Sequence, residues 1–242
     1  MIPKTINYIW LGKKKKPKLV KDAIKSWRKK APEYKIVEWN EEKIDSIMDG
    51  NSFYYNALNN KNFSFASDYA RLAILYNYGG IYLDTDIILT KNPSKYLKDR
   101  ELVLGIENPK RGYILTAFIA SIPHQNFIGL LLNSYENKIY DKSKLVPNSQ
   151  EIGAIAFKKF NLEYKGITQF RNESKIVIYS PNILYQPSFQ SVAIHIGMAS
   201  WEENLRLHDR LRVKTRRHIH NRFEAGIFRF VNDIFRRIIP NI

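Results

Sequence analysis

The sequence contains no cysteine among its 242 residues. This absence excludes disulfide bridges, thiolate metal sites and cysteine nucleophiles. No apolar run approaches the roughly 20 residues that a bilayer-spanning helix requires. The short apolar start is followed by lysines at 13–16 and does not fit a secretory signal. We therefore expect a cytoplasmic protein.

Acidic residues are scarce beside basic ones, with 23 Asp and Glu against 39 Lys and Arg and a formal net charge of +16. A surface of this charge attracts anions, so nucleic acid, acidic lipid headgroups and phosphorylated small molecules are all candidate partners. Hydrophobic residues make up 44% and aromatic residues 13% of the chain, which is enough to bury a sizeable core. The composition favours one folded domain and excludes a disordered chain.

Apolar runs of strand length alternate with segments of helical spacing. The predicted strands cover residues 5–11, 34–39, 81–83, 87–89, 102–106, 114–120, 175–179 and 191–196, and the predicted helices cover residues 19–30, 40–48, 64–78, 126–139 and 150–160. Asn40 and Ser64 are the predicted N-caps of the second and third of these helices. This alternation indicates an α/β fold with a mostly parallel sheet, and such sheets bind ligands at the carboxyl ends of their strands.

The C-terminal part, residues 204–242, differs from the rest because it holds ten Lys and Arg against three Asp and Glu, a net charge of +7. Apolar residues recur at three- and four-residue spacing through 216–239. We therefore predict a catalytic domain at 1–203 and a basic amphipathic helical tail at 204–242. Such a helix lies in an anionic membrane surface, or it packs on the core or on a second subunit.

Two aspartates, Asp84 and Asp86, follow the apolar run 81–83. In a regular strand, residues i and i+2 point to the same side, where two carboxylates repel unless a cation lies between them. Oxygen ligands suit Mg²⁺ or Mn²⁺, which complete their shell with water and substrate phosphates. The pair indicates a divalent ion that carries a nucleotide diphosphate. The alternative is a solvated turn, since this short pattern often occurs by chance.

Asp68 and Arg71 lie three residues apart on the predicted helix 64–78 and therefore share a face. Leu72 and Leu75 place that face toward the core, where a charged side chain is costly unless it is paired or bound. One interpretation is a buried structural ion pair. The other is that Asp68 contacts sugar hydroxyls while Arg71 contacts phosphate or sugar.

Three separated motifs resemble one family. Residues 67–86 (SDYARLAILYNYGGIYLDTD) are similar to the DXD sugar-binding region of glycosyltransferase family 32, which includes bacterial capsular-polysaccharide transferases and yeast initiation mannosyltransferases. They are also similar to the catalytic domains of large clostridial glucosylating toxins. Residues 2–12 (IPKTINYIWLG) resemble the opening I-P-K-x-I-H-x-x-W-x-G, with Asn7 in place of histidine, and residues 193–201 (AIHIGMASW) resemble the C-terminal H…SW element.

The resemblance implies a GT-A nucleotide-diphospho-sugar transferase fold, with a Rossmann-like mixed sheet flanked by helices and a divalent ion. In relatives, the tryptophan that matches Trp10 stacks on the nucleobase. The backbone that matches Ile9 and Leu11 lines that pocket, and Tyr82 would lie against the nucleotide. A core side chain is the alternative for Trp10.

The resemblance also implies roles for the charged residues. The aspartate that matches Asp86 binds the metal directly in relatives. The residue that matches Asp84 contacts ribose and sugar or holds the metal through water. Asp68 and Arg71 match the pair that holds the donor sugar. We therefore predict that these four residues form the catalytic centre.

A histidine near the end of an apolar strand, His195, precedes the segment that ends in Ser200 and Trp201. Such a histidine is usually a hydrogen-bonded core residue, but its ring nitrogen is also a good ligand for Mn²⁺ beside carboxylates. We predict His195 as a third metal ligand. The following segment would close over the diphosphate, with Ser200 and Trp201 on the leaving phosphate, and would exclude water.

These observations predict a metal-dependent, retaining glycosyltransferase that uses Mn²⁺ or Mg²⁺. We expect it to move a hexose from UDP-galactose or UDP-glucose to a saccharide acceptor, lipid-linked in one version, during capsule or other surface polysaccharide synthesis. We expect peripheral contact with the inner face of the cell membrane and no nucleic acid partner. The alternatives are a basic nucleic-acid-binding module, and a metal-dependent nucleotide-sugar phosphohydrolase or nucleotidyltransferase.

Overall fold

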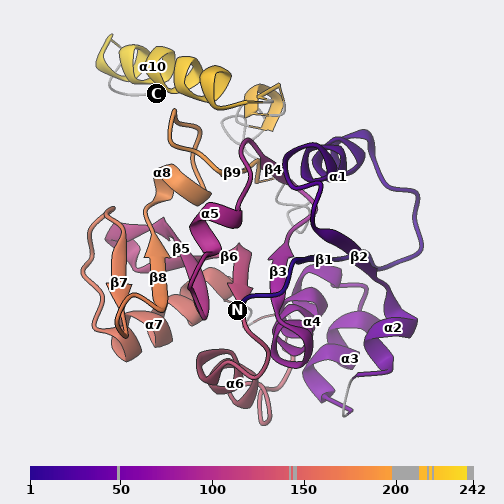
Figure 1. The fold of residues 1–242 in the computed structure, drawn as a ribbon. Coiled ribbons are helices and arrows are strands. Elements are labelled where there is room, and N and C mark those ends of the chain that lie inside the picture. The colour runs from indigo at the N-terminus through magenta and orange to yellow at the C-terminus, as the bar shows by residue number, and fades with distance from the viewer. Residues whose placement is uncertain are drawn as a thin grey trace.

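The computed structural model of the chain describes residues 1–47, 50–141, 143, 146–197, 213–216, 218–219 and 221–238. Seven strands form one sheet in the order β2-β1-β3-β6-β5-β8-β7 (Figure 1). Their bounds are β1 (Thr5–Ile9), β2 (Lys35–Trp39), β3 (Gly80–Leu83), β5 (Leu102–Asn108), β6 (Tyr113–Ser121), β7 (Gln169–Arg171) and β8 (Ile176–Tyr179). Two short strands, β4 (Ile87–Leu89) and β9 (Ala193–His195), form a separate antiparallel pair.

The large sheet is mixed. The pairs β1–β2, β1–β3 and β5–β8 are parallel, whereas β3–β6, β5–β6 and β7–β8 are antiparallel. Half of the strand pairs are thus antiparallel, and the prediction of a mostly parallel sheet is wrong. The reason is the short connection between β5 and β6, a 3-10 turn at Pro109–Arg111 that ends at Gly112 in the left-handed conformation and reverses the chain. A mixed sheet flanked by helices is what the GT-A class requires.

Helices cover both faces of this sheet. They are α1 (Lys18–Lys30), α2 (Glu41–Asp45), α3 (Ser52–Asn59), α4 (Phe63–Tyr78), α5 (Ser94–Leu97), α6 (Asn126–Asn133), α7 (Asn148–Phe160) and α8 (Pro181–Leu184), and a further helix, α10 (Arg222–Ile238), lies outside these two layers. One core lies between one face of the sheet and the helices that cover it, α2, α3, α4, α6 and α7. The second lies between the opposite face and α1, α5, α8 and the β4–β9 pair. The inner strands are thus buried on both sides, as expected for an α/β fold, whereas the edge strands β2 and β7 are partly exposed.

Element boundaries follow local hydrogen bonding. Helix α2 begins after Asn40, whose Oδ1 accepts from Lys43 N at 3.1 Å, as the sequence predicts. Helix α4 begins at Phe63, so Ser64 lies within the helix and does not cap it. That helix ends at Gly79, which has a φ of 64° and turns the chain directly into β3. Helix α3 has no counterpart among the predicted helices.

The tail contains the predicted amphipathic helix, but α10 begins at Arg222 rather than at residue 216. The reason is Asn221, whose Oδ1 accepts from Phe223 N at 2.9 Å and from Glu224 N at 3.1 Å. Figure 1 shows α10 at one end of the molecule, beyond α8 and β9. In the part of the chain that the structure describes, no helix combines the length and apolar character needed to cross a membrane.

Helix α7 lies close to the start of β6 at Gly153. A Cβ at this position would lie 2.1 Å from Gly112 O, so a side chain cannot fit without a backbone shift. This close contact determines where the first turn of α7 lies. That turn carries Asn148 and Ser149, which line the large cleft of the protein.

We expect Gly153→Ala to lower the free energy of unfolding by about 1–3 kcal/mol, because the added methyl group overpacks the α7–β6 contact. Gly166→Ala is the matched control: the nearest atom to its Cβ would lie 3.7 Å away, and we expect a change within about 0.5 kcal/mol. Urea denaturation measures both. Equal stabilities of Gly153→Ala and the wild-type protein would contradict the packing argument.

Candidate active site

A cleft of about 1370 Å³ opens at the carboxyl ends of β1 and β3. The two strands are parallel neighbours, so the segments that follow them meet at the same edge of the sheet. Nine of the residues predicted from the sequence line this one cleft: Ile9, Trp10, Leu11, Asp68, Arg71, Tyr82, Asp84, Asp86 and His195. The predicted Ser200 and Trp201 lie outside the described residues, and the structure says nothing of them.

Arg71 is the most constrained charged group of the cleft, with 3% of its surface exposed. Its Nη2 lies 2.8 Å from Asp68 Oδ1 and 3.4 Å from Asp84 Oδ1. Its Nη1 donates to Thr116 O at 2.9 Å, and its Nε donates to Ser67 O at 3.1 Å. The guanidinium thus joins helix α4, the end of β3 and strand β6. The structure confirms the buried ion pair between Asp68 and Arg71, and both residues line the cleft.

Tyr82 completes this arrangement from β3. Its ring lies beneath the Arg71 guanidinium, with the carbon of that group 4.8 Å from the ring centroid. Its hydroxyl donates to Asp84 Oδ1 at 2.8 Å. Burial raises the pKa of Tyr82 well above its ordinary value, so the hydroxyl remains a donor. Asp84 is therefore oriented by a neutral hydroxyl and a guanidinium together.

Burial also changes the pKa of the two partners of the ion pair. Burial raises the pKa of Asp68 to about 6 from its ordinary value of 3.8, and the opposing effect of Arg71 is smaller. Burial opposes the charge of Arg71, yet the neighbouring carboxylate of Asp84 raises its pKa above the ordinary value. The guanidinium therefore keeps its charge in the interior.

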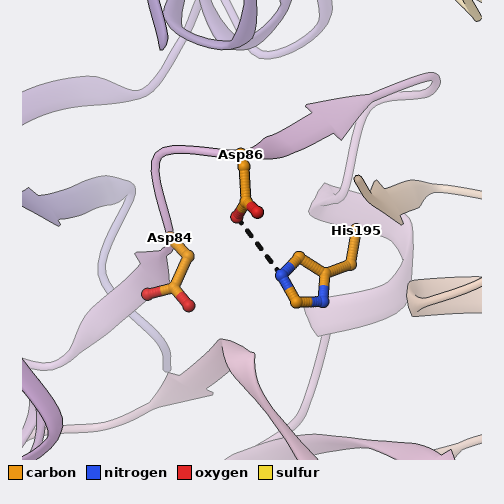
Figure 2. A group of neighbouring side chains, drawn as sticks. All are labelled: Asp84, Asp86 and His195. Carbon is orange, nitrogen blue, oxygen red and sulfur yellow. Dashed lines mark ion pairs between the residues drawn. The ribbon is translucent and has the colours of Figure 1, made fainter. Parts of the chain in front are cut away.

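Asp84, Asp86 and His195 form the second cluster. One ligand atom from each side chain lies within 4.8 Å of the other two. Figure 2 shows the three side chains pointing into one space from the end of β3, the turn before β4, and β9. His195 Nε2 lies 3.3 Å from Asp86 Oδ1. Two carboxylates and one imidazole are a donor set that fits a divalent ion such as Mn²⁺.

The two aspartates converge through a turn, whereas the sequence interpretation placed them on one side of a regular strand. Strand β3 ends at Leu83, and Ile87 N donates to Asp84 O at 3.0 Å, which closes a turn around Thr85 and Asp86. The expected geometry is thus wrong, although the expected proximity is correct. The turn aims both carboxylates into the cleft and leaves β4 free to pair with β9.

His195 reaches Asp86 because β9 pairs with β4, with His195 opposite Ile87. Burial, the largest single effect, favours the neutral ring, but Asp86, Asp84 and Glu107 together outweigh it and raise the pKa of His195. A residue more than 100 positions away in sequence therefore completes the acidic pair. Only the sheet pairing brings them together.

Trp10 also lines the cleft, directly after β1. Its Nε1 donates to Lys14 O at 2.7 Å, and the Lys16 ammonium lies 5.6 Å from its ring centroid. Asn7, which replaces the histidine of the resembling family, is buried away from the cleft. Its side chain donates to Gly79 O at 3.1 Å and accepts from Trp39 Nε1 at 3.0 Å, so its role here is structural.

Asn148 lines the cleft but was not predicted from the sequence. Asn148 is 6% exposed and lowers the pKa of Asp68, which shows that the two side chains are close. Its Oδ1 accepts from the Tyr135 hydroxyl at 3.2 Å, while its Nδ2 has no partner at hydrogen-bond geometry among the described residues. Asn148 at the start of α7 follows Pro147, but this pattern alone is too common to indicate a site.

Residues 17–103 match the family model described as "Glycosyltransferase sugar-binding region containing DXD motif". The matched range contains Asp68, Arg71, Asp84 and Asp86. It begins after Trp10 and ends before His195. The resemblance stated from the sequence is confirmed over this range.

Two relatives of known name match part of the chain. Inositol phosphoceramide mannosyltransferase 1 of Schizosaccharomyces pombe is 30% identical over 128 residues, which cover 51% of this chain and 40% of the relative. Lactosylceramide 4-alpha-galactosyltransferase of Rattus norvegicus is 39% identical over 70 residues, which cover 28% of this chain and 18% of the relative. The chain thus matches less than half the length of either.

Two solved structures share the fold. The PaToxG glycosyltransferase has a TM-score of 0.52 at 19% identity, covering 66% of this chain and 70% of that one. The apo-form glycosyltransferase GlyE of Streptococcus pneumoniae has a TM-score of 0.50 at 11% identity, covering 99% of this chain and 64% of that one. The predicted GT-A class is confirmed.

We expect the buried Asp68 carboxyl to make stability depend on pH. Its proton is lost near 3.8 in the unfolded chain but near 6 in the folded protein. Between these values the folded state binds more protons, so the free energy of unfolding falls as the pH rises. Asp68→Asn should lack this component, about 2–3 kcal/mol over the range.

Urea denaturation from about pH 4 to about pH 6.5 measures how the free energy of unfolding changes with pH in the wild-type protein and in Asp68→Asn. Asp22→Asn, which removes a carboxylate paired with Lys18 on the surface, should keep the wild-type slope. Parallel slopes for wild-type protein and Asp68→Asn would show that Asp68 titrates normally.

Proposed function

We propose that the chain is a metal-dependent, retaining glycosyltransferase that moves a hexose from a nucleotide-diphosphate sugar to a saccharide acceptor. The observation that carries this proposal is the cleft itself. It places an Asp84–Asp86–His195 cluster beside a buried guanidinium, and Trp10 lines the same cleft. This arrangement lies on a GT-A fold and includes the matched sugar-binding region.

The cleft suggests how a nucleotide sugar would lie. The nucleobase would stack on Trp10, which Lys14 and Lys16 hold at the end of β1. The diphosphate would lie at the acidic cluster. The hexose would lie against Asp68 and Arg71, beside the buried Asn148.

UDP-galactose or UDP-glucose is the proposed donor. The galactosyltransferase relative supports a galactose donor, while the mannosyltransferase relative makes GDP-mannose the main competitor. A thermal-shift screen of nucleotide sugars with Mn²⁺ separates these donors, because a ligand that binds only the folded state raises its melting temperature.

Asp86 and His195 would hold the divalent ion directly, and Asp84 would hold it directly or through water. The ion supplies Lewis-acid stabilisation of the negative charge on the departing nucleoside diphosphate. A ligand set that includes a ring nitrogen favours Mn²⁺ over Mg²⁺, which prefers oxygen ligands and retains water. Tyr82 and Arg71 hold the Asp84 carboxylate in orientation.

The chain's own residues favour attack from the leaving-group side. Asp68 is held in the ion pair with Arg71, so it is placed to accept from sugar hydroxyls and not to attack the anomeric carbon. We therefore propose that the acceptor hydroxyl attacks on the face from which the diphosphate departs. The leaving phosphate oxygen takes the acceptor's proton, which leaves a new glycosidic bond and a nucleoside diphosphate.

The competing functions have less support. A phosphohydrolase or nucleotidyltransferase of the two-metal type needs a second ligand cluster about 4 Å from the first. Within the described ranges, one group of three potential metal ligands is present. The net charge of +16 motivated the nucleic-acid-binding alternative. The described structure explains the charge without it, since many basic side chains lie on the outer face of α1 and in the tail.

We propose a lipid-linked acceptor in surface polysaccharide synthesis, with peripheral attachment of the protein through α10. Ala225 and Phe228 face the protein body, where they pack near Ile194 and Ile219. The opposite side of the helix exposes a run of large apolar residues: Phe223, Ile227, Phe230, Val231 and Ile234. An apolar face beside the +7 charge of 204–242 complements an anionic lipid surface.

We expect Asp86→Asn to lower the transfer rate at least about 100-fold, because the ion loses a charged ligand worth several kcal/mol in the transition state. The assay measures sugar transfer or donor hydrolysis with Mn²⁺, and again with EDTA. Asp22→Asn controls for the loss of a surface carboxylate and should leave the rate unchanged. The expected product is a nucleoside diphosphate.

Three results would overturn this proposal. Near-normal activity of Asp86→Asn would remove the metal assignment, and so would full wild-type activity in EDTA. Release of a nucleoside monophosphate would identify a phosphohydrolase instead.

We expect the wild-type protein to co-sediment with vesicles of anionic phospholipid at low ionic strength and to be released by salt, which screens charges beyond a Debye length of about 8–10 Å. The triple variant Phe223→Glu, Ile227→Glu, Phe230→Glu should not bind, because it places charge on the outer face of α10. Ile167→Glu changes an exposed apolar residue elsewhere and should bind normally. Binding by the triple variant, or a wild-type dimer that the triple variant disrupts without any vesicle binding, would refute membrane attachment.

A further inference from the structure

Part of the segment after residue 204 returns to the acidic cluster. Arg216 lies on the short helical stretch 213–216, and its Nη1 donates to His195 O at 2.7 Å. Its guanidinium carbon lies 5.7 Å from the ring centroid of Tyr185. The Tyr185 ring in turn lies 5.9 Å from the His195 ring. Arg216 therefore contacts the backbone of His195 and the aromatic neighbour of its imidazole.

The backbone around His195 is held at three points. His195 N donates to Tyr185 O at 3.1 Å. The peptide that follows His195 is held on both sides, since Ile196 N donates to Asp86 O at 3.0 Å and the carbonyl accepts from Arg216. The peptide group between His195 and Ile196 thus links the backbone of Asp86 to the side chain of Arg216.

The contact from Arg216 matters because β9 is a three-residue strand at the edge of a two-stranded sheet. A strand this short gains little rigidity from its own ladder. A hydrogen bond from a charged guanidinium to a carbonyl is stronger than one between neutral groups. It fixes the last residue of β9, which is the residue that carries the imidazole.

Apolar contacts anchor the stretch that carries Arg216 on both sides. Val213 packs against the second core, and Ile219 is 3% exposed and packs on Ile194, which immediately precedes His195. Residues 213–216 and 218–219 are therefore part of the catalytic body. The predicted boundary after residue 203 does not separate an independent tail from the site at these residues.

We propose that Arg216 is a positioning residue for the metal ligand His195, so that the segment beyond residue 204 helps to build the metal site. The proposal rests on the proposed function, since it takes His195 as a ligand. It assigns Arg216 no contact with the ion or the substrate. Groups that hold a metal-ligating histidine in place typically contribute 10–100-fold to metal affinity.

The test measures Mn²⁺ binding to the full chain without any donor, by calorimetry and by electron paramagnetic resonance. We expect Arg216→Ala to raise the Kd for Mn²⁺ about tenfold. Arg216→Lys keeps the charge but lacks the planar group that bonds the carbonyl and covers Tyr185, so we expect an intermediate Kd. Arg229→Ala is the matched control, because Arg229 also ties the tail to the body, through Asn182, but does not touch His195.

Spin-echo spectra give a second readout that a general loss of stability would not change. Nitrogen from a bound imidazole modulates the Mn²⁺ signal, and His195→Ala should abolish that modulation. We expect Arg216→Ala to weaken it and Arg229→Ala to preserve it. Circular dichroism in EDTA establishes that each variant is folded; if Arg216→Ala is not, Arg216→Lys carries the test.

The outcomes separate this inference from the proposed function. If the wild-type protein shows no specific Mn²⁺ site or no imidazole nitrogen on the ion, His195 is not a ligand, and both this inference and the proposed metal site are overturned. If the wild-type protein binds Mn²⁺ through nitrogen and folded Arg216 variants match it, only the positioning role is overturned.

Discussion

The buried guanidinium of Arg71 is the interaction on which the rest of the site depends. A guanidinium cannot discard its charge at any accessible pH, so its burial requires acceptors on every side. Asp68, Asp84, Ser67 and Thr116 supply them from helix α4, the end of β3 and strand β6. The same charge that these groups compensate holds Asp84 in place beside the neutral Tyr82 hydroxyl. Core packing and the position of one acid in the cluster therefore have a common cause.

The second constraint is the accumulation of negative charge at one edge of the sheet. Asp84 and Asp86 approach each other within a turn, and β9 brings His195 to within 3.3 Å of Asp86. Carboxylates this close repel each other without a positive partner. The same negative charge raises the pKa of His195. The cluster is thus suited to a cation, and its third member depends on a carbonyl contact from Arg216.

Much of this site was predictable where the chemistry is local in the chain. The three-residue spacing of Asp68 and Arg71 among leucines predicts a charged pair facing the core, and the structure places both there. The apolar runs before and after Asp84 and Asp86 predict the two strands that flank the turn. The sequence predicted the wrong starting residue for two helices, because more than one nearby residue could begin each of them. Ser64 looks like a helix cap but lies inside α4, and the start of α10 depends on Asn221 rather than on the apolar repeat.

The sequence by itself determined the fold class, the acidic pair, the charged pair on α4 and the amphipathic character of the tail helix, because each depends on residues within a few positions of one another. Only the tertiary structure decided the order of the strands in the sheet, the inclusion of Asn148 in the cleft and the contact of Arg216 with His195. The physical reason is that these features depend on which strands pair and how closely α7 approaches β6. Strand pairing and helix packing join segments far apart in the chain, so the spacing of neighbouring residues does not predict them.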